Sequence, residues 1–465
     1  MIQISFLLDG GVLMTTKQKV FCGNLLFTPE FGRLELLKQA LMIVDDNGMI
    51  SAVIQQDDEK YEQIRTEAKQ AGILQEFLAE QYLLPGFVDL HIHASQWPQA
   101  GIALDDPLNV WLDECTFPLE SKYQDLDFAR EVYNDLVEQL LARATTTAVY
   151  FATQHLEASY ELAKISAQKG QRAFVGKVVM DNPKQTPDFY RDKDSQSAIA
   201  DTKEFIRRVK QLGKDVKQGV YPVITPRFVP SCTDETLAAL GKLAQETDAY
   251  VQTHCSEGQW EHDYVLERFG KRDTEVLADF GLLKRKSIMD HCNFVNEADG
   301  ELFAKKQAAI AHCPISNAYF ANGVLQAKRL HKQGVKVGLG TDISGGFSPS
   351  LYDNIKQCVM SSRMLEDGVD VDLPAQQRGK KDSRLSVLEA FYLATKGGGQ
   401  AVCLPLGSFE AGQICDFQVL DPTVAANKLP GLNIFKRPVD ILAKLLYLST
   451  PANIKEVWVQ GQRVK

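Results

Sequence analysis

The chain has 465 residues, of which 45% are hydrophobic and 24% are charged, a balance that is ordinary for a soluble globular protein. A net charge of −9 and the absence of any Lys/Arg-rich run argue against nucleic acid or an anionic membrane surface as the main partner. No window is apolar over the length needed to span a bilayer.

The nine cysteines are scattered, and no two of them are separated by just two residues. This spacing argues against a disulfide framework and against a zinc knot built from cysteine. We therefore expect a reduced, cytoplasmic protein whose thiols stay free: Cys22, Cys115, Cys232, Cys255, Cys292, Cys313, Cys358, Cys403 and Cys415.

The first residues, MIQISFLLDGGVLM, resemble the apolar core of a signal peptide only superficially. Asp9 and two glycines interrupt the run, and no basic residue precedes it. We expect residues 1–16 to be a poorly ordered extension, with Met14 as a candidate start.

Both ends of the chain show a pattern of short strands separated by turns. Residues 17–84 contain ALMIVDDNGMISAVIQQ, whose Asp-Asn-Gly predicts a hairpin, and a helix is expected near Asp58–Glu80. Residues 400–465 contain further short strands. We therefore predict one small discontinuous β-sandwich domain built from residues 1–84 and 400–465, with Gly397-Gly398-Gly399 as the hinge that returns to it.

The middle of the chain, residues 85–399, alternates strand and helix patterns. Eight strands separated by helical segments predict a parallel sheet closed into a (β/α)8, TIM-like barrel. The alternative, a doubly wound sheet, lacks the Gly-rich phosphate fingerprint after its first strand. The predicted strands are Phe87–His93, Thr146–Thr153, Ala173–Asp181, Val220–Phe228, Tyr250–Glu257, Ser287–Phe294, Ala308–Ser316 and Val335–Ser344.

Histidines end several of these strands. His91 and His93 lie two apart on the first strand, so their side chains share one face. His254, His291 and Asp342 end later strands. Because active sites of α/β barrels lie where the strands end, these groups are expected to converge at one mouth. Imidazole nitrogens with a carboxylate oxygen are typical of catalytic zinc, which keeps a position open for water.

The residues around these histidines have separate expected roles. Cys255, Cys292 and Cys313 each follow a histidine and point to the opposite strand face, so we expect them to pack toward the helices. Glu257 follows His254 by three residues, where the chain leaves the strand. From there its carboxylate can move a proton between a metal-bound water and a substrate.

The motifs, taken together, resemble the amidohydrolase superfamily and, within it, the guanine deaminases. The resemblance covers nearly the whole chain and keeps the family's motif order. Cys415 stands where the family usually has Ala. The matching segments are PGFVDLHIHASQ (85–96), WLDECTFPLE (111–120), GKVVMD (176–181), ITPRFVPSC (224–232), THCSE (253–257), the His291 strand, AHCPISN (311–317), GLGTDISGG (338–346) and SFEAGQICDFQVLD (408–421).

The resemblance implies a hydrolase that converts guanine to xanthine and ammonia, with activated water attacking C2 and Glu257 as proton shuttle. It implies one zinc ion per subunit held by His91, His93, His254 and Asp342, with His291 orienting the water. It also implies catalytic roles for Glu257, His291 and Asp342, and a homodimer. The implied substrate-binding residues are His93, Ala94, Ser95, Gln96, Arg227, Phe228, His254, Glu257, Asp342 and Trp111.

Several of these roles make sense from the side chains alone. A fixed guanidinium such as that of Arg227 can bind the guanine carbonyl, and Gln96 offers both an amide donor and an acceptor. Phe228, Trp111 or Phe117 can cover the base, although plain core packing is the alternative for Trp111 and Phe117. Lys177 lies on the third strand, whereas relatives with two metals carry a carboxylated lysine on the fourth, which favours one zinc.

Other interpretations of the function stay open at this point. A related mononuclear enzyme, acting on another aminopurine or aminopyrimidine or on a chlorinated triazine, would share the metal ligands. A non-catalytic scaffold with this fold would be expected to have lost a ligand. His312 is expected near the site with a structural hydrogen bond or a substrate role, and His155, His262 and His331 are expected on loops or helix surfaces.

Overall fold

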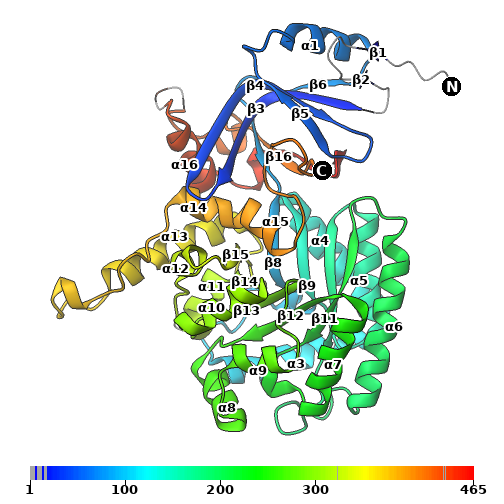
Figure 1. Ribbon diagram of the computed structural model, residues 1–465, viewed down its shortest axis with the longest axis vertical. Helices are drawn as coiled ribbons and strands as arrows, with labels where there is room; N and C mark the ends of the chain where they lie inside the picture. The colour runs from blue at the N-terminus through cyan, green and yellow to red at the C-terminus, as the bar shows by residue number, and fades with distance from the viewer. Residues whose placement is uncertain (1–5, 8–12, 15–17, 322, 433, 435) are drawn as a thin grey trace.

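The computed structural model describes residues 6–7, 13–14, 18–321, 323–432, 434 and 436–465. A barrel of parallel strands lies beneath a separate mixed sheet, which confirms the predicted fold class (Figure 1). Among the described residues, no helix has both the length and the apolar character needed to cross a membrane.

Eight parallel strands form the barrel in chain order, β8 to β15. The ring closes where Ile92 of β8 bridges Ile343 and the His93 N–H donates to the Ile343 carbonyl at 2.8 Å. All eight predicted strands are present, but most were predicted too long at their C-terminal ends. The strands are β8 (Phe87–His93), β9 (Thr145–Phe151), β10 (Arg172–Val179), β11 (Val220–Pro226), β12 (Tyr250–Cys255), β13 (Ser287–His291), β14 (Ala309–His312) and β15 (Lys336–Leu339).

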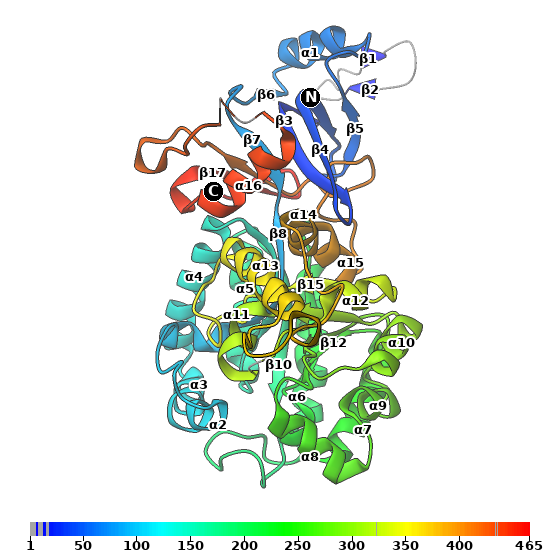
Figure 2. The same ribbon diagram turned by 90° about the vertical axis from the view of Figure 1, so that its left-hand side faces the viewer.

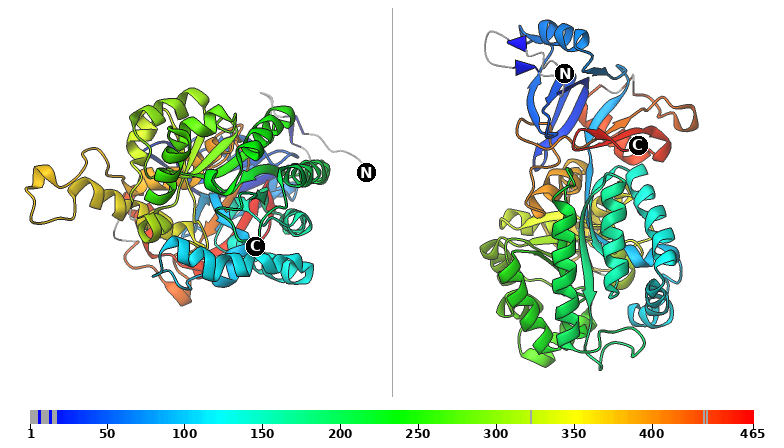
Figure 3. Two further views of the ribbon diagram at one scale, coloured as in Figure 1. Left: turned by 90° about the horizontal axis from the view of Figure 1, so that it is seen from below. Right: turned by 90° about the vertical axis from the view of Figure 1, so that its right-hand side faces the viewer.

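Helices surround the barrel, as the view along its axis from below shows (Figure 3). Their apolar faces pack on the outward residues of the strands, while a second cluster that includes Val88, Leu90 and Phe174 fills the barrel interior. The main covering helices are α4 (Leu126–Ala142), α5 (Leu156–Gln168), α6 (Ser195–Gly213), α7 (Asp234–Thr247), α8 (Gln259–Phe269), α9 (Asp273–Asp279), α10 (Glu297–Lys306), α12 (Ala327–Lys332), α13 (Leu351–Asp367) and α14 (Val387–Tyr392).

Both ends of the chain contribute strands to the small domain, and these strands form one mixed sheet, whereas the two packed sheets of a β-sandwich were predicted. The predicted hairpin is the turn between β4 and β5, where Gly48 has a φ of 79°. The sheet order is β18 (Gln462–Arg463), β17 (Ile454–Val459), β16 (Phe417–Leu420), β7 (Tyr82–Pro85), β3 (Lys19–Glu30), β4 (Arg33–Val44) and β5 (Ile50–Ile54), with β6 (Leu74–Glu76) beside β3.

Two further features lie near the chain ends. Helix α1 (Tyr61–Gln70) falls within the predicted helical stretch, and α16 (Pro438–Leu448) packs near the small sheet. The predicted extension, residues 1–16, lies outside the described residues except for the paired strands β1 (Phe6–Leu7) and β2 (Leu13–Met14).

The small sheet covers the end of the barrel where the strands begin (Figure 2). Only Gly86 separates β7 of the sheet from β8 of the barrel. The Arg172 guanidinium, at the start of β10, donates to Asp416 and Gln460 of the small domain and to Thr147. The mouth formed by the C-terminal strand ends is therefore left free for a site.

The glycine triplet 397–399 does not form the predicted hinge. It lies in consecutive helical turns, η7 (Leu393–Gly397) and α15 (Gly398–Ala401), at the end of the barrel that the small sheet covers (Figure 1). A Cβ on Gly398 would come within 2.6 Å of the Val88 Cβ, so this position requires glycine for close packing rather than for bending.

A segment that we call the arm, residues 360–384, stands away from the barrel (Figure 1). It comprises the last turns of α13 and the loop that follows. Five apolar side chains of the arm are exposed, most of all Val371 at 77%: Met360, Met364, Val369, Val371 and Leu373.

Candidate active site

The strand-end histidines and Asp342 meet at the mouth of the barrel, as predicted. His91 and His93 lie at the end of β8, His254 is the next-to-last residue of β12 and His291 ends β13. Their ring centroids lie about 5 Å apart, for example 4.8 Å between His91 and His93. Asp342 lies three residues beyond β15, and its Oδ1 is 3.1 Å from His91 Nε2 and 3.5 Å from His93 Nε2.

A shift in register lets β8 present both histidines to the mouth. The pairing of β8 with β9 shifts between Asp89 and Ile92. Leu90 packs in the barrel interior, whereas Ile92 packs against the outer helices. The bulge therefore changes which residues face inward, so that His91 follows Leu90 on the inside.

Neighbouring groups fix which ring nitrogen faces the site in His91, His254 and His291. His91 Nδ1 lies 3.1 Å from Asp290 Oδ2, and the His254 Nδ1–H donates to the Arg227 carbonyl at 2.6 Å. The His291 Nδ1–H donates to Asn317 Oδ1 at 2.9 Å. Each Nε2 is thereby left pointing at the centre of the cluster, the arrangement that metal-binding histidines use.

The electrostatics of the cluster favour a cation. Burial and the nearby His91 hold the pKa values of His93 and His254 well below the usual range, so both rings are neutral. Burial opposes protonation of His91 as well, but Asp290 and Asp342 outweigh it and raise the pKa of His91 to about 10. The site therefore attracts positive charge, and a bound metal ion would take the place of that proton.

The distances in the cluster fit a tetrahedral ion. Two ligand atoms bound to zinc at 2.0–2.1 Å lie about 3.3 Å apart when the geometry is tetrahedral. The His93 and His254 Nε2 atoms lie 3.1 Å apart, and Asp342 Oδ1 lies 3.1 Å from His91 Nε2 and 3.5 Å from His93 Nε2. In the described part of the chain, neither His291 Nε2 nor Asp342 Oδ1 has a hydrogen-bond partner. The residues present therefore fit a metal ion.

The backbone turns sharply where these strands end. Ser256, His291, Cys292 and Asp342 all have positive φ, between 48° and 65°. Such conformations cost side-chain-bearing residues on the order of 1 kcal/mol each or more, and they cluster at functional sites. Two of the predicted strands were too long for this reason: left-handed backbone at Ser256 ends β12, and left-handed backbone at His291 and Cys292 ends β13.

Glu257 lies on the turn after β12, next to the cluster. Its Oε1 is 3.8 Å from His291 Nε2. The Glu257 N–H donates to Glu261 Oε2 at 2.7 Å, and its carbonyl accepts from the Asn293 amide at 3.0 Å. Burial raises the pKa of the Glu257 carboxyl. A carboxyl group that is held in place and has a raised pKa is suited to taking up and returning a proton.

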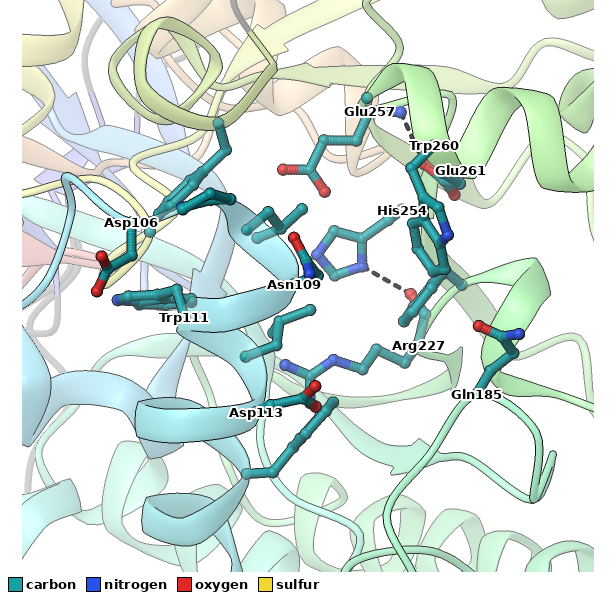
Figure 4. Close-up of a pocket in the computed structure, with 18 of the residues that line it drawn as sticks. Asp106, Asn109, Trp111, Asp113, Gln185, Arg227, His254, Glu257, Trp260 and Glu261 are labelled. Carbon is teal, nitrogen blue, oxygen red and sulfur yellow. Dashed lines mark hydrogen bonds between the residues drawn. The ribbon is translucent and has the colours of Figure 1, made fainter.

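A cavity of about 1150 Å³ opens above the cluster. Figure 4 shows the His254 ring between the Glu257 carboxylate and the Arg227 guanidinium, with Trp111 and Trp260 on opposite walls. The cavity is larger than one heterocyclic base requires, and its rim is aromatic. Of the predicted substrate-binding residues, those that line it are His93, Gln96, Trp111, Arg227, Phe228, His254, Glu257 and Asp342.

The aromatic candidates differ in their surroundings. Phe117 lies in the cavity wall, with the Arg227 guanidinium 5.1 Å from its ring centroid. The Trp111 indole N–H donates to the Ile102 carbonyl at 3.0 Å, so this ring also secures the wall. Phe228 contacts Trp260 edge-on at 5.8 Å. Ala94 and Ser95 are buried and are not among the lining residues, so their contact with a base stays a prediction.

Lys177 lies away from the cluster. It shares the outward face of β10 with Val175, and its ammonium donates to Asp192 Oδ1 at 2.9 Å. Cys255 and Cys292 pack between barrel and helices as predicted, but Cys313 packs in the barrel interior. The reason is strand alternation: Ala309, Ala311 and Cys313 face inward.

The remaining histidines also differ from expectation in part. His312 falls on the outward face of β14, and burial lowers its pKa to about 3. His262 is buried against Phe294, where a helix-surface position was predicted. His331 stacks on Phe31 with ring centroids 4.0 Å apart.

Several residues of the site were missed by sequence reasoning. Asp290 and Asn317 orient histidines, and Glu261 holds the Glu257 backbone. Glu120 pairs with Arg227 and accepts from Gln96. A signal existed for Glu120, because it ends the WLDECTFPLE segment, but that segment alone does not show what its carboxylate contacts.

Comparison with known proteins agrees with this geometry. Residues 82–464 match the amidohydrolase family. The chain is 37% identical to a guanine deaminase of Dictyostelium discoideum over 96% of this chain and 98% of that protein. It is 35% identical to the guanine deaminase of Homo sapiens over 96% of each. A crystal structure of guanine deaminase from C. acetobutylicum with guanine bound in its active site superposes with a TM-score of 0.84 at 32% identity, covering 96% of this chain and 100% of that one.

Proposed function

The chain belongs to the amidohydrolase family, and on that premise we propose that it hydrolyses guanine to xanthine and ammonia. The observation that carries the proposal is the common space faced by the histidine and Asp342 cluster, by Glu257 and by Arg227. One wall of this space can activate water, and another can bind a purine carbonyl. The similarity to guanine deaminases over almost the full chain supports the same substrate.

We propose that the metal is zinc, one ion per subunit, held by His91, His93, His254 and Asp342. Zinc suits this set of three imidazoles and one carboxylate, and when bound it polarises a water molecule and lowers the pKa of that water toward neutrality. His291 faces the same centre and is assigned to orienting the water rather than to holding the ion. Lys177, paired with Asp192, is not assigned to a second metal.

The cavity residues supply the contacts for the base. The Arg227 guanidinium donates to the C6 carbonyl of guanine, and the Gln96 amide carbonyl accepts from N1–H. Phe228 covers the face of the purine. These contacts would hold C2, which carries the amino group, toward the cluster, because N1 lies between C2 and C6 in the ring.

The acidic residues then move the protons. As the water oxygen bonds to C2, Glu257 takes a proton from the water and gives it to N3, which keeps the ring neutral. Burial opposes ionisation of Asp342, but His91 outweighs it and lowers its pKa, so Asp342 stays ionised and accepts a hydrogen bond from the attacking water. Glu257 then passes the proton of the new C2 hydroxyl to the amino group, which leaves as ammonia, and C2 keeps the oxygen as a carbonyl.

The activity is tested by following the ultraviolet spectrum of guanine with purified protein. We expect conversion to xanthine with release of ammonia, loss of turnover after chelation, and recovery on adding zinc. Adenine, cytosine and ammeline, assayed for ammonia in parallel, separate this activity from those of related deaminases and triazine hydrolases. Turnover of one of these in place of guanine would overturn the proposed substrate, and protein that binds no zinc would overturn the metal assignment.

We also propose that the protein is a homodimer and works in the cytoplasm. The exposed apolar side chains of the arm, such as Met364 and Val371, suit contact with a second copy. A Met364→Lys variant should then shift from dimer to monomer in sedimentation. All nine cysteines are free, which suits a reducing compartment. Thiol titration of freshly isolated protein should therefore find nine reduced thiols per chain.

A further inference from the structure

Glu120 is a buried carboxylate that does not line the cavity but contacts two residues that do. It lies on α3 (Phe117–Ser121), and the residue is only 1% exposed. Its Oε2 accepts from Arg227 Nη1 at 2.7 Å and its Oε1 accepts from Arg227 Nη2 at 3.3 Å. Its Oε1 also accepts from the Gln96 amide at 3.0 Å. One carboxylate therefore holds both polar side chains proposed to bind the base.

The contact with Glu120 fixes the orientation of the Gln96 amide. A carboxylate paired with a guanidinium only accepts hydrogen bonds, so the NH2 end of the amide must face Glu120. The carbonyl end must then face away from Glu120. Gln96 Oε1 is buried and has no hydrogen-bond partner among the described residues, while Gln96 lines the cavity. The amide thus offers the cavity an acceptor and withholds a donor.

The same contact leaves Arg227 able to donate into the cavity. Each terminal nitrogen of a guanidinium carries two N–H groups, and the pair with Glu120 uses one from each. Burial opposes the charge of Arg227, but Glu120 outweighs that effect and raises the pKa of the guanidinium. Arg227 is therefore a permanently charged donor beside an acceptor supplied by Gln96.

We propose that Glu120 is a positioning residue that sets the hydrogen-bonding polarity of the base pocket and so selects purines with a lactam edge. A donor beside an acceptor complements the C6 carbonyl and N1–H of guanine. It opposes the edge of 2,6-diaminopurine, which has an amino donor at C6 and an acceptor at N1 but the same amino group at C2. The proposal rests on the proposed deamination of guanine and names the residue that discriminates at that site.

A purely structural role for Glu120 makes a different prediction, and the chain offers a matched control. Gln99 donates to Thr116 Oγ1 at 2.8 Å, and this buried contact joins the same two segments that Gln96 and Glu120 join. Neither Gln99 nor Thr116 lines the cavity. Losing this contact should loosen the packing of the segments without changing the orientation of the Gln96 amide.

The test compares kcat/KM for guanine and for 2,6-diaminopurine in the zinc-loaded wild type, in Glu120→Gln and in Thr116→Val. In Glu120→Gln the new amide can donate to the Gln96 carbonyl, so that Gln96 turns its NH2 toward the base. The preference for guanine should fall roughly 10²-fold, since sites built around buried hydrogen bonds discriminate by at least that much. Thr116→Val should keep the wild-type preference. Where turnover of 2,6-diaminopurine is too slow, its inhibition constant against guanine replaces kcat/KM.

The outcomes separate this proposal from the proposed function. A wild type that does not turn over guanine would refute the deaminase assignment itself. If the wild type does turn over guanine, either of two results would overturn the role of Glu120 alone. One is a preference for guanine in Glu120→Gln equal to that of the wild type, and the other is an equal loss of preference in Glu120→Gln and Thr116→Val. If Glu120→Gln does not fold, Glu120→Asp takes its place. Its carboxylate is one methylene shorter and cannot reach Arg227 and Gln96 together, so the preference should fall there too.

Discussion

The two ends of the barrel handle buried charge in opposite ways. At the end covered by the small sheet, the terminal nitrogens of Arg172 donate four hydrogen bonds, two of them to the Asp416 carboxylate. At the mouth, six ionisable groups converge, and His291 Nε2 and Asp342 Oδ1 have no hydrogen-bond partner among the described residues. Charge satisfied within the fold stabilises it, whereas charge left unsatisfied is available for a ligand.

Backbone strain does not follow the same division. Ser256, His291 and Asp342 have positive φ at the mouth, but Ala144, Asp248 and Gln307 also have positive φ, at the covered end, within two residues of the starts of β9, β12 and β14. From the difference in buried charge alone, we expect changes at the mouth to act on activity more than on stability and changes at the covered end to do the reverse.

The largest expected effect is that of Glu257→Gln at the mouth. An amide of the same shape cannot carry the proton, so kcat for guanine should fall about 10³-fold or more. The thermal midpoint should stay the same or rise, because a buried carboxylate that opposes folding has been removed. Kinetics and calorimetry on the same preparation check both. A variant with near-normal turnover, or one that loses activity only by unfolding, would contradict the assignment.

The next effect concerns the covered end. Arg172→Met leaves Asp416 buried without its cation, which should lower the free energy of unfolding by about 3–5 kcal/mol. Below its unfolding transition the variant should keep the wild-type kcat/KM. Urea unfolding measures the loss, and Arg172→Met combined with Asp416→Asn should recover part of it. A fall in kcat/KM in the folded variant would show that the two ends are coupled.

A third prediction concerns the buried ion pair of Lys177 and Asp192, which lies beside the mouth. Because its two charges pair with each other, we expect it to act on stability, as the Arg172–Asp416 pair at the covered end does. Lys177→Met should lower the free energy of unfolding by about 3 kcal/mol, because Asp192 loses its buried partner. Zinc content and kcat should stay the same, since Lys177 faces the helices. Elemental analysis and steady-state kinetics decide. Loss of metal from Lys177→Met, but not from Asp192→Asn, would place Lys177 at the metal site after all.

The regular parts of the barrel were predictable from the sequence, but their ends were not. The strand pattern predicted the bounds of β8 (Phe87–His93) correctly, and the rule that barrel sites lie at strand ends predicted that four histidines and Asp342 meet at one mouth. Asp290 was missed because the prediction took His291 as the inward residue of its strand. Because Ile288 faces inward, alternation makes Asp290 the inward residue, and His291 joins it only through its left-handed backbone. Periodicity carries no information about such a turn.

Contacts between distant segments were the other limit. Glu120 lies 107 residues from Arg227 and 24 from Gln96, on a short helix with no regular apolar pattern. The motif identified the segment, but only the fold shows that one carboxylate contacts both side chains. His262 was misjudged for a similar reason, since its burial depends on the packing of α8 against Phe294.

The smallest expected effect concerns Asp273, a buried residue that supports the turn carrying Glu257. It shows whether a charge next to the mouth also lowers stability. Asp273, the first residue of α9, accepts from the Ser256 hydroxyl at 2.9 Å, directly before Glu257. Burial raises the pKa of Asp273 to about 7. The folded protein therefore keeps a proton that the unfolded chain releases near pH 4. The stability contributed by this proton is fully present below that pH and is lost as the pH rises through about 7.

Asp273→Asn keeps the shape and stays neutral at every pH, so it should be more stable than the wild type at pH 8, by about 1 kcal/mol, and no more stable at pH 4. Urea unfolding of both proteins at the two pH values gives the difference directly. Ser256→Ala, which removes the hydroxyl but keeps the carboxyl, should not gain stability at pH 8. An equal gain for Asp273→Asn at both pH values would show that packing rather than charge is responsible. The contact of Asp273 with Ser256 would then not oppose folding through its charge, and in this it would resemble the paired charges at the covered end.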